Sequence, residues 1–243
     1  MIDAISAALV RHRRPILVTG LLVAGGHATA MGYAPDVARA SALPLLLALT
    51  FLLLAIISMG TRSAALVVLP RSAAFASPVP AWLVLLTLGL LGQASATVGA
   101  YLRSTEAGIA TTFDVVVGLP WLVLIALLVA AAWRGHSVWL SPDGIRTMGL
   151  LGSRMIPWDA GPRVEAESNG MRSLMRLPLT IGNPTLVRRR GLVGRLAIPA
   201  DGVQPRFLAS VIDHYVAHLD HRAAIGTPDE YRRLVAHLHG TAG

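Results

Sequence analysis

The sequence predicts a membrane α-helical bundle with four transmembrane helices, followed by a C-terminal α+β domain. Hydrophobic residues make up 54% of the 243 residues and charged residues only 14%, whereas soluble domains carry about 25% charged residues. The charge is uneven, because residues 1–133 contain 7 arginines and residues 134–243 contain 14. Long apolar stretches lie in the first part, and short stretches bounded by turn residues lie in the second.

Four apolar stretches follow a short leader of residues 1–14. Each stretch is 17 to 22 residues long, close to the roughly 20 that a helix needs to cross about 30 Å of hydrocarbon. Over such lengths in lipid, a helix satisfies all of its own backbone hydrogen bonds. The predicted spans within residues 15–133 are residues 15–33, 43–59, 81–102 and 115–133.

The arginines also predict an orientation. They concentrate in the leader, in the connection between the second and third spans, and after the fourth span. Positive residues favour the cytoplasmic side, so we expect a multi-pass protein of the inner (plasma) membrane with both termini cytoplasmic. One alternative is that residues 28–30, Ala-Thr-Ala, are a signal cleavage site, in which case the first span is removed.

Residues 136–243 have the pattern of a domain rich in β-strands. Residues 137–140 and 145–148 flank a Ser-Pro-Asp-Gly sequence at 141–144, and these residue types favour a tight turn between two strands. Gly, Pro and Asn separate the further predicted strands, which are residues 154–158, 163–166, 174–181, 186–190 and 192–198.

Two helices are predicted after the strands. Apolar residues recur at three- and four-residue spacing over residues 204–218, which is typical of an amphipathic helix. A last helix starts at Thr227-Pro228-Asp229-Glu230, where Thr227 caps the helix and Glu230 completes a capping box. Residues expected in the domain core are Ile156, Trp158, Ile198, Phe207, Val211 and Tyr215.

Two short motifs carry a resemblance to a known family. Val138-Trp-Leu-Ser-Pro-Asp-Gly-Ile145, followed by Ile156-Pro-Trp-Asp159, resembles the opening of bacterial pleckstrin-homology-like (PH) domains. His-Arg-Ala-Ala-Ile-Gly-Thr at 221–227 and Glu-Tyr-Arg-Arg-Leu at 230–234 are similar to membrane proteins of the uncharacterised actinobacterial type that carry this domain. The resemblance implies an antiparallel β barrel or sandwich with a capping helix, used for binding rather than catalysis.

The densest charge cluster is Arg188-Arg189-Arg190, with Arg195 nearby. Beneath an anionic leaflet, each arginine contributes about 1 kcal/mol of attraction. We therefore treat these four arginines as a candidate lipid-binding surface, although a solvated face is an equally simple interpretation of a charge run.

Polar and small residues within the spans suggest helix contacts. His27 lies in the first span and Gln93 in the third, so they form a candidate intramembrane pair, with either a packing role or a place in a polar path. Small residues recur every four positions at Gly26, Ala30 and Ala34. This spacing allows close helix packing, but it also arises by chance in an alanine-rich chain.

Other chemistry is not indicated by the sequence. His214 and His218 share a helix face and could ligate a metal, but a solvated face is the simpler interpretation, so no metal and no cofactor are predicted. Cysteine is absent, which excludes disulfides and thiolate ligands. The sequence has no phosphate-binding glycine loop, GxSxG or HExxH motif, and no known nucleic-acid-binding module.

The expected function is therefore non-enzymatic. The helices anchor a binding or scaffolding domain at the cytoplasmic face, where it binds lipid headgroups or a protein partner. The alternative is a small transporter or channel component with a polar path through the helices, including His27 and Gln93.

Overall fold

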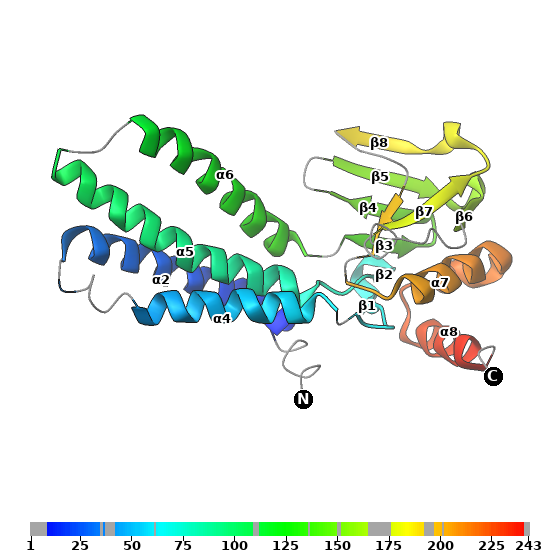
Figure 1. Cartoon of the computed structure of the whole chain (residues 1–243). Helices are drawn as coiled ribbons and strands as arrows, with labels where there is room; N and C mark the ends of the chain where they lie inside the picture. Colours follow the sequence, from blue (N-terminus) through cyan, green and yellow to red (C-terminus); the bar gives the residue numbers. More distant parts are fainter. Residues whose placement is uncertain are drawn as a thin grey trace. The chain divides into compact units, whose positions relative to one another are not determined.

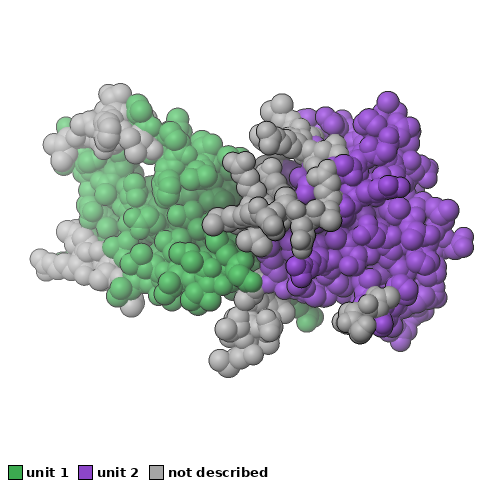
Figure 2. Space-filling view, turned by 45° about the vertical axis from the view of Figure 1, so that its right-hand side comes forward, with its two compact units in different colours: residues 1–61, 80–134 green, residues 62–79, 135–243 purple. Residues whose placement is uncertain are grey.

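The chain forms two compact units, which Figure 2 shows in different colours. Unit 1 comprises Met1–Thr61 and Pro80–Arg134, and unit 2 comprises Arg62–Val79 and Gly135–Gly243. The computed structural model describes residues 9–34, 36, 42–60, 62–108, 112–135, 137–149, 152–164, 176–191, 197–200 and 202–240.

Unit 1 consists of helices that coincide closely with the four apolar stretches (Figure 1). They are α2 (Arg13–Tyr33), α4 (Ala42–Ser58), α5 (Ala81–Glu106) and α6 (Thr112–Arg134). Helix α5 is central, because it packs against each of the other three. Most of the exposed large apolar side chains of the described chain lie on α2, α4 and α6, so the outside of this unit is apolar.

The prediction of four transmembrane helices is wrong. Among the described residues, only α2 and α5 are both long and apolar enough to cross a membrane. The apolar parts of α4 and α6 that are described with their side chains, Leu45–Ser58 and Gly118–Arg134, are shorter than the roughly 20 residues that a span requires, and α6 contains Pro120. Core helices of soluble proteins and signal sequences can match α2 and α5 in length and hydropathy, so membrane anchoring itself stays a prediction.

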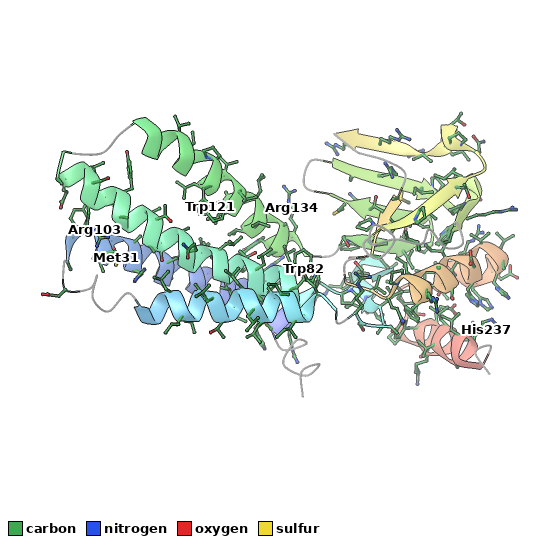
Figure 3. All side chains as sticks on the ribbon, in the orientation of Figure 1. Met31, Trp82, Arg103, Trp121, Arg134 and His237 are labelled. Carbon is green, nitrogen blue, oxygen red and sulfur yellow. The ribbon has the colours of Figure 1, made fainter. Side chains whose placement is uncertain are left out.

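Glycines allow α2 and α5 to approach closely. A Cβ atom at Gly99 would lie 2.4 Å from Cβ of Met31 (labelled in Figure 3) and 3.0 Å from the carbonyl oxygen of Ala28. A Cβ atom at Gly32 would lie 2.9 Å from that of Leu102. Gly26, in contrast, faces open space. Small residues therefore do mediate this helix contact, but at other positions than the four-residue repeat indicated.

Gly99→Ala should weaken unit 1. The added methyl group overlaps Met31 and the backbone of α2, and such overpacking typically costs 1–3 kcal/mol. Unfolding of the detergent-solubilised chain by added denaturant, followed by helical circular dichroism, measures the effect. Gly25→Ala is the matched control, because nothing lies within 4 Å of its Cβ position. Equal loss in both variants would contradict a close approach at Gly99.

The described residues of unit 2 form two antiparallel sheets and two α-helices. The larger sheet has the strand order β1-β2-β3-β4-β5-β8 and the smaller has the order β6-β7-β9. The strands are β1 (Val67–Leu69), β2 (Ala74–Ala76), β3 (Val138–Ser141), β4 (Gly144–Met148), β5 (Gly152–Pro157), β6 (Pro162–Val164), β7 (Arg176–Ile181), β8 (Arg188–Gly191) and β9 (Ala197–Pro199). Helices α7 (Pro205–Ala217) and α8 (Pro228–Gly240) follow, and short 3-10 turns are η1 (Pro70–Ser72), η2 (Trp158–Ala160), η3 (Pro184–Leu186) and η4 (Leu219–Ala224).

The predicted hairpin and most of the predicted core are confirmed. Strands β3 and β4 pair with Ser141 opposite Gly144, so Pro142 and Asp143 form a two-residue turn. Trp158 is 4% exposed and its Nε1 donates a hydrogen bond to the Ser141 carbonyl at 2.9 Å. Of the six predicted core residues, Phe207 is half-buried, and the buried ones are Ile156, Trp158, Ile198, Val211 and Tyr215.

The β1–β2 hairpin comes from the connection between α4 and α5. Phe75 on β2 is fully buried, lies opposite Leu140 on β3, and packs against the ring of Tyr231 with centroids 5.4 Å apart. The N–H of Leu66 donates a hydrogen bond to the Tyr231 hydroxyl at 3.0 Å. In the sequence, the arginines of this connection contribute to the predicted orientation, but no strand is predicted within it. Because β2 and β3 share a sheet, the segments 62–79 and 135–243 must lie in one compartment.

Candidate functional site

Four histidines gather at the α7–η4–α8 end of unit 2. His214 is on α7, His218 follows its last residue, His221 is on η4 and His237 (labelled in Figure 3) is on α8. The His214 ring centroid lies 4.5 Å from that of His218, 5.0 Å from His237 and 5.2 Å from His221. In the sequence, His214, His218 and His221 follow one another closely, but only His214 and His218 have the four-residue spacing that places them on one helix face.

Backbone capping positions His221 beside His214. The last turn of a helix leaves carbonyl groups without partners, and Arg222 satisfies two of them. Its Nε donates to the Tyr215 carbonyl at 2.7 Å and its Nη2 donates to the Val216 carbonyl at 3.3 Å. This contact holds η4 against the end of α7, so the Nε2 of His214 and the Nδ1 of His221 lie 3.1 Å apart.

Glu230 brings a buried carboxylate to the same place. The residue is 1% exposed, and a buried carboxylate needs compensating partners. The Tyr215 hydroxyl donates to Oε1 at 3.3 Å, and Arg233 Nη1 donates to Oε2 at 3.1 Å. Half of the predicted capping box forms, because the Glu230 N–H donates to Thr227 Oγ1 at 3.2 Å, while the carboxylate points to the cluster.

His214, His221 and Glu230 together form a compact donor set. The Nδ1 of His221 lies 3.8 Å from Oε1 of Glu230. The three possible ligand atoms all lie within 4.8 Å of one another. Imidazole nitrogens and a carboxylate oxygen are donors that divalent transition metals accept. The sequence shows no acidic or histidine partner at a fixed position for His214, His218 and His221, so no metal is expected there. The fold brings Glu230 to this position.

Burial controls protonation in this cluster. Burial, followed by the neighbouring His218, His237 and His221 in that order, lowers the pKa of His214 to about 4. His214 is therefore neutral at neutral pH, with a lone pair on one ring nitrogen. Burial also raises the pKa of the Tyr215 hydroxyl, followed by the charge of Glu230, so Tyr215 stays protonated and can donate to the carboxylate.

The predicted arginine surface is only partly continuous. Arg188, Arg189 and Arg190 are exposed on the edge strand β8, but successive strand residues point to opposite faces. Arg189 lies opposite Arg154, which is 2% exposed, and burial, then Arg189, lowers the pKa of Arg154. Arg188 and Arg190 therefore share the other face. Arg195 lies outside the described residues.

His27 has a different partner from the predicted one. Its Nδ1 lies 2.9 Å from Oγ of Ser95 on α5, whereas Gln93 is exposed. A hollow of about 600 Å³ lies between α2, α5 and α6, and its lining is apolar apart from Ser95 and Arg134. This lining gives little support to a polar path through unit 1.

Comparisons with protein-family models, with curated proteins and with solved structures found no match. The resemblance to bacterial PH-like domains therefore stays a prediction. Two antiparallel sheets followed by α7 are compatible with that fold.

Proposed function

We propose that the chain is a membrane-anchored binding protein, in which apolar helices of unit 1 contact the bilayer and unit 2 binds anionic lipid headgroups at the cytoplasmic surface. The observation that carries the proposal is the apolar exterior of unit 1. Leu22, Ile56 and Val116 are 72%, 64% and 63% exposed. A soluble monomer rarely exposes large contiguous apolar patches.

The cost of leaving this exterior in water supports the proposal. Fully burying one Leu, Ile or Val side chain stabilises a protein by about 1.5–3 kcal/mol relative to exposure. Seven such side chains are exposed on α4 alone, namely Leu46, Leu47, Leu49, Leu53, Leu54, Ile56 and Ile57. Contact with lipid acyl chains removes this surface from water. Among its described residues, unit 2 exposes few large apolar side chains, as expected for a unit in water.

The chain connections favour binding close to the membrane. The chain passes between the two units at residues 61–62, 79–80 and 134–135, so unit 2 is attached to the helices at three points. Arg188 and Arg190 offer two positive charges on one face of an edge strand. Charged side chains on an edge strand also prevent unwanted strand pairing. The experiment must therefore distinguish this role from lipid binding.

Replacing Arg188 and Arg190 together with glutamine should weaken binding to anionic vesicles roughly thirtyfold. Each arginine contributes about 1 kcal/mol near an anionic surface, and about 1.4 kcal/mol corresponds to a factor of ten. The full chain is reconstituted in phosphatidylcholine nanodiscs. Its binding to vesicles of phosphatidylcholine, with and without phosphatidylserine, is then measured by flotation.

The control variant removes the same charge from other elements. Arg163 on β6 and Arg206 on α7 are also exposed, so their joint replacement with glutamine changes net charge equally. Binding that depends on the β8 face falls only in the first variant and weakens with salt. Equal binding to neutral and anionic vesicles, or equal loss in both variants, would reject this surface and favour a protein partner.

A further inference from the structure

We propose that His214, His221 and Glu230 form a binding site for a divalent transition-metal ion of the Zn²⁺ type, which joins α7, η4 and α8. The site lies entirely within unit 2. It is independent of the proposed lipid surface, because its residues follow β9 and do not include the β8 arginines.

The spacing of the donor atoms fits a four-coordinate ion. Zinc bonds of about 2.0–2.2 Å in a tetrahedron place neighbouring ligand atoms roughly 3.3–3.5 Å apart. His214 Nε2 and His221 Nδ1 are 3.1 Å apart, and His221 Nδ1 and Glu230 Oε1 are 3.8 Å apart. All three donor atoms lie within 4.8 Å of one another, so side-chain rotations that shorten the longest of these separations bring them to ligand positions.

The surroundings hold the donor groups in place. His214 is buried on α7, and the Tyr215 hydroxyl and Arg233 orient the Glu230 carboxylate. Hydrogen-bonded outer partners of this kind orient metal ligands in known sites. Thr227 caps α8 three residues before Glu230, so the carboxylate is fixed in the first helical turn rather than on a free loop.

A purely structural role explains the cluster less completely. In that interpretation, His214 and His221 share one N–H···N hydrogen bond and Glu230 is neutralised by Arg233. Oε1 of Glu230 then accepts from the Tyr215 hydroxyl and lies 3.8 Å from Nδ1 of His221, too far for a hydrogen bond, so this interpretation leaves the carboxylate beside the two histidines without a bond to either. An ion between the three side chains would bind Nε2 of His214 and Nδ1 of His221, which face each other. It would also compensate the negative charge of the Glu230 carboxylate.

The proposed site leaves one coordination position open. Two histidines and one glutamate are three protein ligands, so a water molecule or an outside ligand occupies the fourth position of a tetrahedral ion. His221 is half-buried and His218 beside it is exposed, so solvent reaches this side of the cluster. The ion would also fix η4 and α8 to α7 and so stabilise the end of unit 2.

Cobalt binding to the full chain in detergent tests the proposal without any assumed activity. Co²⁺ in a four-coordinate site of nitrogen and oxygen ligands absorbs visible light, and Zn²⁺ should displace it. We expect one ion per chain. His221→Asn and Glu230→Gln should each weaken binding by more than about a hundredfold, since loss of an outer partner alone costs 10- to 100-fold.

His12→Asn is the matched control, because His12 is an exposed histidine in unit 1, and it should bind as the parent does. His221 is not fully buried, so His221→Asn should fold, and the metal-free circular dichroism spectrum checks this. With excess Zn²⁺, the unfolding temperature should rise in the parent and in His12→Asn only. Absence of stoichiometric binding in the parent, or unchanged affinity in a folded His221→Asn variant, would overturn the proposal.

Discussion

Replacing Phe75 with alanine is expected to destabilise unit 2 by about 3–5 kcal/mol, the usual cost of deleting a buried phenylalanine side chain. Phe75 is fully buried between β3 and Tyr231, although it belongs to the connection between two apolar helices. Hydrogen exchange of the full chain in detergent measures the effect locally. Protection of β3 and β4 amides should fall by a hundredfold or more, since about 1.4 kcal/mol corresponds to a factor of ten.

Val67→Ala provides the control within the same hairpin. Val67 is 38% exposed, and substitutions at such partly exposed positions usually change stability by less than a buried deletion does. Exchange in β3 and β4 should therefore remain close to that of the parent. Unchanged protection in Phe75→Ala would show that β1 and β2 are not an integral part of the sheet.

Gly226→Ala should destabilise unit 2 by a comparable amount, about 2–6 kcal/mol. Gly226 has a φ angle of +93°, a region in which a non-glycine residue costs about 1–3 kcal/mol. Its Cβ would also lie 2.3 Å from the backbone carbonyl carbon of Ala73 and the nitrogen of Ala74. Because both neighbours are backbone atoms, the β1–β2 hairpin must move away from the turn before α8, and overpacking of this kind adds about 1–3 kcal/mol.

Limited proteolysis of the detergent-solubilised chain measures whether the β1–β2 hairpin has moved away from the turn before α8. If it has, the segment 62–79 should become cleavable at Arg71. Gly240→Ala is the same substitution at the end of α8, where nothing lies within 4 Å of the Cβ position, and it should leave cleavage unchanged. If the Gly226→Ala variant resists proteolysis as well as the Gly240→Ala variant does, that result would contradict the tight contact between Gly226 and Ala73.

Local patterns in the sequence predict many of the helices and strands of each unit. They do not predict which segments of the chain belong to which unit. The Pro-Asp turn, the apolar period of α7 and the cap at Thr227 all act over a few residues, and these elements form where they were expected. The pairing of Phe75 with Leu140 joins distant parts of the chain. Such a contact leaves no periodic signal, so the segment around β1 and β2 was treated as a connection.

The candidate metal site was missed for a similar reason. A spacing of four residues linked His214 to His218, but His221 and Glu230 approach His214 because the chain reverses through η4. Glu230 had already been given a capping role from its position three residues after Thr227. The run of three arginines is evident in the sequence. Composition does not reveal that strand alternation places Arg189 on one face and Arg188 and Arg190 on the other.

The pairing of β2 with β3 also sets an order of events during synthesis. Residues 67–76 leave the ribosome before α5 and α6, and their partner strand begins only at Val138. Synthesis at about 5–20 residues per second makes this interval several seconds, whereas a hairpin forms in about 1–10 μs. The β1–β2 hairpin must therefore remain soluble with an open strand edge, which is prone to aggregation, until α5 and α6 have been made.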